Sequence, residues 1–294
     1  MIKLFISYSH PDNTYVEEFR RFIAPLCEND RMEAWYDRNI TAGDDFWNQI
    51  DSHLEDRDIV CLFVSSYYLA SKACKEEMRQ AFEMKKSRGI AVIPIILSPC
   101  MWSENENLKK KLALPTDGKP ISDFDDQDKA WMDVCNGLKS VVERLERIKA
   151  LKFKAEHISF LNDASLFTKA HENKEVLKME DIFVSPELEK YNEEKNKREK
   201  LSFDLLVENF EESSKIVIAG DDQSGKTSIA KVFIQRLRGK NFIPVYLKDE
   251  EELLQGDLRY RVEQLFKEQY ETNRNLTDLE IERIVPLVDD FHKA

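Results

Sequence analysis

The sequence predicts an α/β protein built on a parallel β-sheet, and two observations predict it. Along the first half of the chain, short apolar runs alternate with amphipathic segments of helical spacing. Two of these runs, residues 59–64 and 90–97, are apolar at successive positions, which is typical of strands covered on both faces. Such alternation favours a parallel sheet with helices on its two sides.

The individual elements follow from the same pattern. Strands are expected at residues 3–6, 32–36, 59–64 and 91–97. Helices are expected at residues 13–27, 45–54, 76–87 and 126–148. Ligands of open parallel sheets bind beyond the carboxyl ends of the strands. We therefore expect one crevice, lined by three loops that directly follow strands, residues 7–10, 37–43 and 65–74.

Composition and charge restrict the class of protein. The 294 residues are 42% hydrophobic and 34% charged, a balance that is typical of globular proteins, and the length allows two ordinary domains. The formal net charge is −12, from 56 acidic and 44 basic side chains. This charge disfavours non-specific binding to nucleic acid or to anionic lipid, so neither is expected as a direct partner.

Cysteine usage and the lengths of the apolar runs predict the compartment. The five cysteines are an odd set without paired spacing, which suits a reducing environment. The first strand begins at about Ile2, which leaves no room for a signal peptide. No apolar run approaches the ~20 residues that cross a bilayer. We therefore expect a cytoplasmic protein without a membrane partner.

Three separated patterns in the first half of the chain resemble those of TIR domains. They are F-I-S-Y-S at residues 5–9, W-Y-D-R-x-I-x-x-G-x-x-x-W at residues 35–47 and C-x-x-E at residues 74–77. The resemblance implies a flavodoxin-like, parallel, five-stranded domain over residues 1–148. It also implies self-association, and one of two roles: a scaffold without enzymatic activity, or a hydrolase that cleaves nicotinamide from NAD. The C-x-x-E glutamate separates these two roles.

That glutamate is Glu77, which the resemblance makes the candidate catalytic residue. Cleavage of the glycosidic bond of NAD builds positive charge on the ribose, which one oriented carboxylate can stabilise; NAD is the substrate and no cofactor is required. We expect Glu77 in the first turn of a helix, where the helix dipole favours the ionised form. Glu76 is the rival candidate, but consecutive helical residues point about 100° apart. The alternative is a surface glutamate that merely complements the dipole.

Candidate NAD-binding residues lie in the loops that follow the strands. Hydroxyl groups at the end of the first strand could hold ribose or phosphate, or could cap the next helix. The loop after the second strand borders the nucleotide and forms the self-association surface in the family, with a simple turn as the alternative. A tryptophan could stack on a base or belong to the core, and the cysteine has a packing role in the family. The candidates are Ser7, Tyr8, Ser9, Asp37, Arg38, Trp47 and Cys74.

A weaker, charged pattern separates the two halves of the chain. Residues 149–210 read as a linker with some helical structure, and residues 193–200 are its most solvated part. Within it, L-K-M-E-D-I-F-V-S-P-E-L at residues 177–188 resembles the segment that precedes the nucleotide-binding domain of bacterial STAND proteins.

The last part of the chain, residues 211–294, resembles the beginning of a P-loop NTPase domain. The loop G-D-D-Q-S-G-K-T-S at residues 220–228 lies between an expected strand at 215–219 and an expected helix. The helix carries apolar residues on one face, and further strands are expected at 242–247 and 284–291, the latter similar to a Walker B strand. These apolar helix residues are Ile229, Val232, Phe233 and Leu237.

The P-loop resemblance implies binding of ATP and Mg²⁺. Backbone N–H groups of the loop would hold phosphates, the lysine would reach the terminal phosphates and the threonine hydroxyl would bind Mg²⁺. The phosphate-binding candidates are Gly220, Ser224, Gly225, Lys226, Thr227 and Ser228. Asp289 would hold the ion and Asp290 would orient a water, although two aspartates at a strand end are a less specific signal. Acidic residues within the loop predict modest affinity.

Together these patterns predict a NAD glycohydrolase that self-assembly activates, fused to an incomplete P-loop NTPase of the STAND type. Further strands, a lid and a sensor domain are not expected within the 294 residues, so we expect either the first part of a longer bacterial defence-type protein or a gene product cut short. The product would be ADP-ribose or a cyclic form of it. Two alternatives stay open: a TIR scaffold without enzymatic activity, and an ATP-binding switch that uses its TIR domain as an interaction handle.

Overall fold

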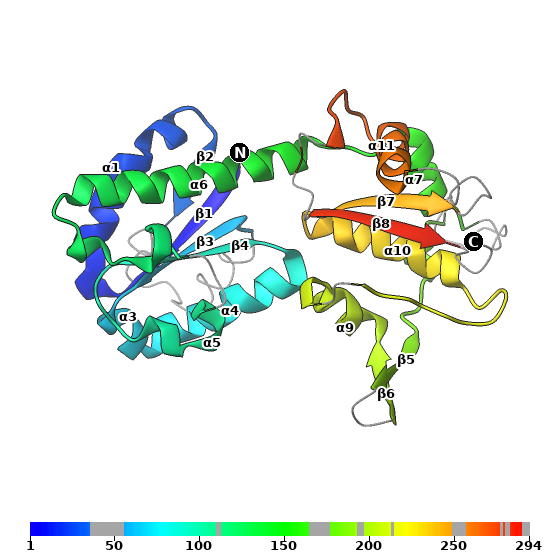
Figure 1. Ribbon diagram of the computed structural model, residues 1–294, viewed down its shortest axis with the longest axis horizontal. Helices are drawn as coiled ribbons and strands as arrows, with labels where there is room; N and C mark the ends of the chain where they lie inside the picture. The colour runs from blue at the N-terminus through cyan, green and yellow to red at the C-terminus, as the bar shows by residue number, and fades with distance from the viewer. Residues whose placement is uncertain are drawn as a thin grey trace. The chain divides into compact units, whose positions relative to one another are not determined.

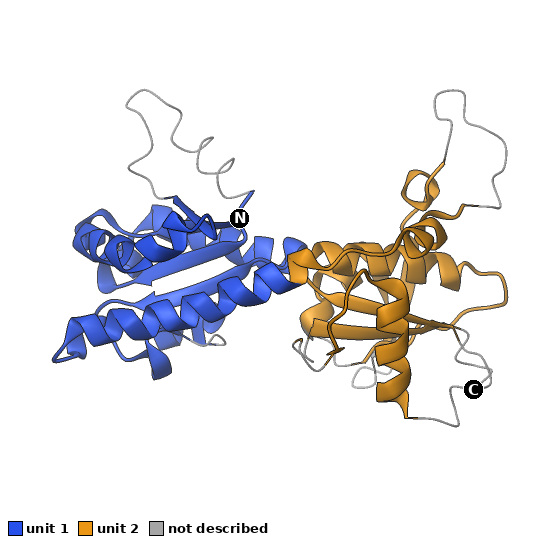
Figure 2. Ribbon diagram, turned by 90° about the horizontal axis from the view of Figure 1, so that it is seen from above, with its two compact units in different colours: residues 1–147 blue, residues 148–294 orange. Residues whose placement is uncertain are grey.

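The computed structural model describes residues 1–35, 56–109, 113–164, 177–192, 197–212, 215–248, 257–276, 279 and 283–289 (Figure 1). The chain divides into two compact units, Met1–Arg147 and Ile148–Ala294 (Figure 2). The division into three segments expected from sequence stays a prediction. Two expectations, the helix at 45–54 and the loop at 37–43, lie outside the described residues.

Unit 1 contains a parallel sheet in the order β2-β1-β3-β4. The strands are β1 (Ile2–Ser7), β2 (Met32–Trp35), β3 (Ile59–Val64) and β4 (Ala91–Ile96). All six residues of β3 are buried, as expected for an apolar run at the centre of such a sheet. The order agrees with the first four strands of a flavodoxin-like sheet, in which a crevice forms where the strand order reverses. The four strands expected from sequence are therefore confirmed, with ends that shift by about one residue.

The fifth strand of the expected sheet is reduced to one bridge in the part of the chain that the structure describes. Leu114 pairs in parallel with Ile95 of β4. Its N–H donates to the carbonyl of Pro94 at 2.8 Å, and its carbonyl accepts from the N–H of Ile96 at 2.8 Å. The described residues thus support a four-stranded sheet with a single-residue extension beside β4.

Helices cover both faces of this sheet (Figure 1). Against one face pack α1 (Asn13–Glu28) and α6 (Gln127–Ala150), through fully buried aromatic residues such as Phe19 and Trp131. Against the other face pack α3 (Ser66–Ala70), α4 (Lys72–Arg88) and α5 (Glu106–Lys109). Short 3-10 turns lie at His10–Asp12, Trp102–Glu104, Thr116–Gly118 and Ile121–Asp123. Burial of each large apolar side chain contributes about 1.5–3 kcal/mol. Because the strands have apolar side chains on both faces, helices pack on both sides of the sheet and form a three-layer arrangement.

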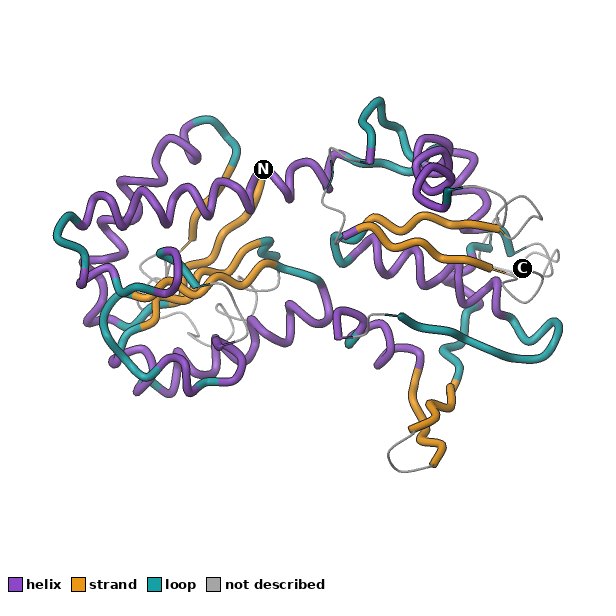
Figure 3. The backbone as a smooth tube through the Cα atoms, in the orientation of Figure 1, coloured by secondary structure: helices purple, strands orange, loops and turns teal. Residues whose placement is uncertain are grey.

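Unit 2 contains two parallel strands, β7 (Ile243–Lys248) and β8 (Ile284–Asp289), shown in Figure 3. Successive side chains of β7 face opposite sides: Val245 packs with α11 (Leu258–Gln269), while Tyr246 packs with α10 (Lys226–Gly239) and α7 (Ala155–Asn162). The apolar face expected for the helix after the glycine-rich loop is confirmed, since its four predicted residues are buried in α10.

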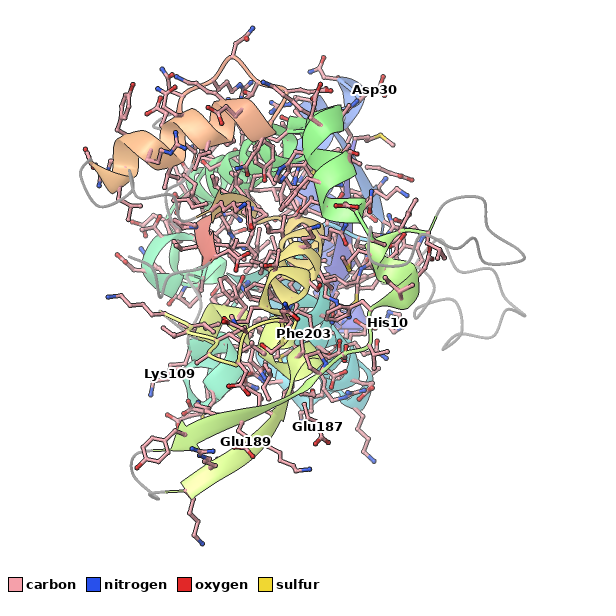
Figure 4. The ribbon with its side chains drawn as sticks, turned by 90° about the vertical axis from the view of Figure 1, so that its right-hand side faces the viewer. His10, Asp30, Lys109, Glu187, Glu189 and Phe203 are labelled. Carbon is pink, nitrogen blue, oxygen red and sulfur yellow. The ribbon has the colours of Figure 1, made fainter. Side chains whose placement is uncertain are left out.

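The segment read as a linker contributes to the core of unit 2. It forms α8 (Met179–Ile182), the antiparallel hairpin β5 (Glu187–Asn192) and β6 (Lys197–Ser202), α9 (Phe203–Glu208) and a 3-10 turn at Phe210–Glu212. Phe203 is fully buried and packs against Phe233 of α10, with ring centroids 5.8 Å apart. Figure 4 marks Glu187 and Glu189 on the hairpin, where they pair with Lys200 and Arg198 at exposed positions.

Three local expectations are wrong. The segment 65–74, expected as a loop, contains α3 and the first residues of α4. Residues 215–219 have no strand assignment; Val217 is 84% exposed, and only Ile216 and Ile218 pack partly against the core. The helix expected at 76–87 begins earlier, at Lys72, because the Ser71 hydroxyl accepts the Cys74 N–H at 3.3 Å and caps it.

Among the described residues, the structure has no helix of the length and apolar character needed to cross a membrane.

Candidate functional site

The candidate active site of unit 1 lies at the carboxyl ends of β1 and β3. Ser7 ends β1, and its hydroxyl donates a hydrogen bond of 2.5 Å to Oε2 of Glu77 on α4. Both side chains are buried, Ser7 at 1% and Glu77 at 8% exposure. The fold therefore joins the first expected loop to the C-x-x-E glutamate across 70 residues of sequence.

A second hydroxyl completes this arrangement. The Tyr68 hydroxyl lies 2.9 Å from Oγ of Ser7, and Tyr68 is fully buried. Because Ser7 uses its only hydroxyl hydrogen on Glu77, the hydrogen between Tyr68 and Ser7 must come from Tyr68. Burial holds the pKa of the Tyr68 hydroxyl well above its usual value, so it remains a donor. The result is a directed relay in which Tyr68 donates to Ser7 and Ser7 donates to Glu77.

The position of Glu77 in α4 corrects one part of the sequence interpretation. Since α4 begins at Lys72, Glu77 lies in the second helical turn and not in the first. The field of the helix dipole decreases within the first turn. The hydrogen bond from Ser7 is therefore the stronger local stabilisation of negative charge on this carboxylate.

Glu76 has a different environment from Glu77. It forms a salt bridge with Arg79, and about 39% of its side chain is exposed. The Arg79 guanidinium lowers the pKa of this carboxyl. Two adjacent glutamates thus have separate roles: Glu76 pairs on the helix surface, and Glu77 points to the strand ends.

Sequence reasoning missed a second buried carboxylate in this region. Asp12 is 4% exposed and accepts a hydrogen bond of 2.6 Å from the hydroxyl of Ser65, which directly follows β3. The same Ser65 oxygen accepts the Tyr68 N–H at 3.1 Å and so caps α3. Burial raises the pKa of Asp12, and the hydrogen bond from Ser65 opposes that rise. These contacts fix the start of α3, from which Tyr68 reaches Ser7.

The remaining candidates of unit 1 divide into described and undescribed residues. Cys74 is buried, and its thiol donates to the Tyr8 carbonyl at 3.5 Å. Burial raises the pKa of Cys74 to about 11, so the thiol stays protonated at neutral pH, which supports packing over nucleophilic attack. Ser9 makes no side-chain cap of the following 3-10 turn. Asp37, Arg38 and Trp47 lie outside the described residues.

In unit 2, the expected phosphate-binding loop leads directly into α10. Gly225 adopts a positive φ of 89°, which glycine permits at low cost, and serves as N-cap of the helix. A Cβ on Gly220 would lie 2.8 Å from Oγ of Ser224, so the Ser224 hydroxyl would have to shift if Gly220 were replaced. The Lys226 ammonium donates to the carbonyls of Gly220 and Asp221 at 2.9 and 2.7 Å. Its charge is thereby held over the loop.

The candidate magnesium ligands approach each other at the end of β8. Oγ1 of Thr227 donates to Oδ2 of Asp289 at 2.7 Å, and Asp289 is 8% exposed. Hydroxyl and carboxylate oxygens suit Mg²⁺, which proteins usually hold with one or two carboxylates and substrate phosphates. The described residues contain no group of three His, Cys, Asp or Glu side chains that could hold a metal without such phosphates. Asp290 lies outside the described residues, and Ser228 follows Thr227 on α10.

Comparison with known families agrees with the fold of unit 1. Residues 4–136 match the TIR domain family. The matched range begins within β1 and includes β2, β3 and β4, as well as Ser7, Tyr68 and Glu77. The match supports a TIR domain in unit 1; TIR domains commonly self-associate, and some cleave NAD.

Two further proteins are similar to part of this chain. An uncharacterised protein, y4lF, from Sinorhizobium fredii (strain NBRC 101917 / NGR234) is 36% identical over 148 residues, which is 50% of this chain. The match spans 46% of that relative, less than half of its length. The TIR domain of the Toll-related receptor TRR-2 from Hydra magnipapillata has 18% sequence identity and a TM-score of 0.35, covering 46% of this chain and 97% of that one.

Proposed function

We propose that unit 1 is a NAD glycohydrolase in which Glu77 is the catalytic carboxylate. The observation that carries this proposal is the buried Glu77 at the strand ends, which accepts a 2.5 Å hydrogen bond from Ser7. A helix-surface glutamate without a binding role would need no such placement, as Glu76 shows by pairing with Arg79.

The main requirement of NAD cleavage is a group that stabilises positive charge at C1′ of the ribose. The bond between ribose C1′ and the nicotinamide nitrogen breaks, its electron pair leaves with nicotinamide, and C1′ becomes positively charged. Water then adds at C1′ and releases a proton, which yields ADP-ribose; attack by an adenine nitrogen gives a cyclic product instead. A fixed carboxylate stabilises the developing cation without reorganisation, which is the largest single contribution in many enzymes. Glu77 takes this role, and no cofactor takes part.

The relay from Tyr68 and Ser7 gives Glu77 its orientation. A carboxylate that swings freely loses much of its benefit, because the stabilisation depends on its position relative to C1′. Ser7 fixes Oε2 of Glu77, and buried Tyr68 fixes Ser7. The candidates Tyr8, Ser9, Asp37, Arg38 and Trp47 would contact the nucleotide around this carboxylate, and self-association through the loop at 37–45 would activate it.

Incubation of the purified protein with NAD, followed by chromatographic separation of the products, tests the proposal. We expect nicotinamide together with ADP-ribose or its cyclic form, with one molecule of nicotinamide released for each molecule of the second product. Intact NAD at high protein concentration would favour the non-enzymatic scaffold instead. In that case, light scattering would still detect self-association of the TIR domain.

We infer a second function for unit 2, which is binding of ATP with Mg²⁺. The contact between Thr227 and Asp289 supports it, because the two expected magnesium ligands meet at 2.7 Å. The Lys226 ammonium over the loop provides charge for the phosphates. With the segment at 177–188, these features favour a bacterial STAND-type switch in a cytoplasmic defence protein, in which nucleotide binding promotes assembly of the TIR effector.

Calorimetric titration with ATP and Mg²⁺ tests this second function. We expect weak binding, and Lys226→Ala should lower affinity about tenfold or more, since hydrogen bonds to charged groups contribute about 1.5–3 kcal/mol. Lys215→Ala, at an exposed lysine before the loop, is the matched control and should retain affinity. Equal binding by all three proteins would place the nucleotide elsewhere.

A further inference from the structure

Asp289 is held by two hydroxyl groups that come from different elements. Oδ2 of Asp289 accepts from Oγ1 of Thr227 on α10 at 2.7 Å and from the Tyr246 hydroxyl on β7 at 2.9 Å. Thr227 is the expected magnesium ligand; its oxygen could offer a lone pair to the ion while its O–H still donates to Asp289. Tyr246 is not an expected ligand, and its hydrogen bond to Asp289 could also persist with the ion bound.

Tyr246 is itself fixed at three points. Its N–H donates to Oε1 of Gln269 at 3.0 Å, and its carbonyl accepts from Nε2 of the same side chain at 2.6 Å. Its ring packs against that of Phe160 on α7, with centroids 4.9 Å apart. The residue is 8% exposed. Its hydroxyl is therefore presented to Asp289 by a side chain whose backbone and ring are both constrained.

We propose that Tyr246 is a positioning residue for Mg²⁺, which orients Asp289 to hold the ion of a magnesium nucleotide. The proposal rests on the inferred binding of ATP by unit 2. Hydrogen-bond partners of metal-ligating groups fix ligand orientation, and their loss typically lowers metal affinity about 10- to 100-fold. In Tyr246→Phe, Asp289 keeps its charge and loses this fixed donor.

The experiment measures ATP affinity by calorimetry in the full chain, once with Mg²⁺ and once with EDTA. The dissociation constant in EDTA divided by the dissociation constant with Mg²⁺ reports the contribution of the metal. We expect Tyr246→Phe to reduce this ratio about 10- to 100-fold or to the point where Mg²⁺ has no effect, with affinity in EDTA unchanged. Asp289→Asn should abolish the benefit of Mg²⁺ altogether.

Tyr270→Phe is the matched control. Tyr270 is also fully buried in unit 2, and its hydroxyl donates to the Pro244 carbonyl at 2.9 Å, so this variant loses a comparable hydrogen bond without touching Asp289. It should keep the wild-type ratio. If Tyr246→Phe does not fold, Phe160→Leu is the alternative. It keeps the Tyr246 hydroxyl but removes the ring that packs against Tyr246, and it should lower the ratio to a smaller extent.

The outcomes separate this inference from the function on which it rests. A wild-type protein that does not bind ATP would overturn both. Binding with a normal magnesium ratio in Tyr246→Phe would overturn only the role of Tyr246. An equal loss in Tyr270→Phe would also overturn it, because the effect would then come from a generally weakened unit 2.

Discussion

The hydroxyl of Ser7 donates to Oε2 of Glu77 at 2.5 Å, and this hydrogen bond links the end of β1 to the second turn of α4. Both groups are buried, so an unmade bond would leave a polar atom without water. The sequence alone places Glu77 on a helix. The hydrogen bond from Ser7 fixes the direction in which its side chain points.

Removal of the relay should lower turnover more than substrate affinity. We expect Ser7→Ala to reduce kcat of NAD cleavage about tenfold or more with little change in KM, because a hydrogen bond to a charged group is lost. Tyr68→Phe should have a smaller effect, since Tyr68 acts through Ser7. Steady-state kinetics of both variants give the comparison.

The double variant distinguishes a relay from two separate packing effects. If Tyr68 acts through Ser7, Tyr68→Phe should change little in a Ser7→Ala background. Tyr67→Phe is the control, because Tyr67 is the neighbouring tyrosine and is 59% exposed. Additive losses in the double variant would show that the two hydroxyls act independently.

Self-association should control the rate of NAD cleavage. We expect specific activity to rise with protein concentration, because the family resemblance implies that a neighbouring TIR domain completes the site through the loop at 37–45. Gly43→Arg should suppress this rise by blocking the contact. Gly239→Arg in unit 2, where a Cβ would meet open space, is the control. Constant specific activity over a wide dilution series would argue for a self-sufficient monomer.

The stability of unit 2 should decrease as pH decreases, because of His157. Its Nε2 has no hydrogen-bond partner among the residues that the structure describes, and burial lowers the pKa of His157 from 6.5 to about 4. Below pH 6.5 the unfolded chain binds a proton that the folded chain does not, so this contribution is complete above that pH and decreases as pH falls toward 4.

Urea unfolding at pH 7.5 and at pH 5 measures this effect. The wild-type protein should lose stability at pH 5, and His157→Leu should lose less, because leucine has no proton to bind. The difference between the two proteins isolates the histidine from other titrating groups. An identical pH dependence in both would exclude a role for His157.

Local pattern was sufficient for much of the fold, but not for the contacts of the site. The run 59–64 is apolar throughout, and it is β3 with the predicted ends. The strand expected at 215–219 is apolar after Lys215, but it has no strand assignment, since strand formation depends on a partner elsewhere in the chain. The early start of α4 was hidden because Cys74 occupies the position where a capping box would place glutamate or glutamine.

The site residues show the same limit. Glu77 could be proposed from sequence because the C-x-x-E pattern, which resembles that of TIR domains, is local. Tyr68 and Asp12 were missed, because their serine partners lie 61 and 53 residues away in sequence and no local spacing predicts those contacts. The available signal was a serine that ends one parallel strand and a serine that directly follows another, since those ends meet at one edge of the sheet.

Comparison of Glu77→Gln with Glu76→Gln in NAD cleavage tests the central claim most directly. The amide keeps the shape of the side chain but removes the charge that stabilises the ribose cation, which typically costs about 10²–10³ in rate. We predict that Glu77→Gln abolishes nicotinamide release while Glu76→Gln, which breaks only a surface pair with Arg79, retains most of it. Loss of activity in Glu76→Gln with full activity in Glu77→Gln would contradict the assignment of Glu77 as the catalytic carboxylate.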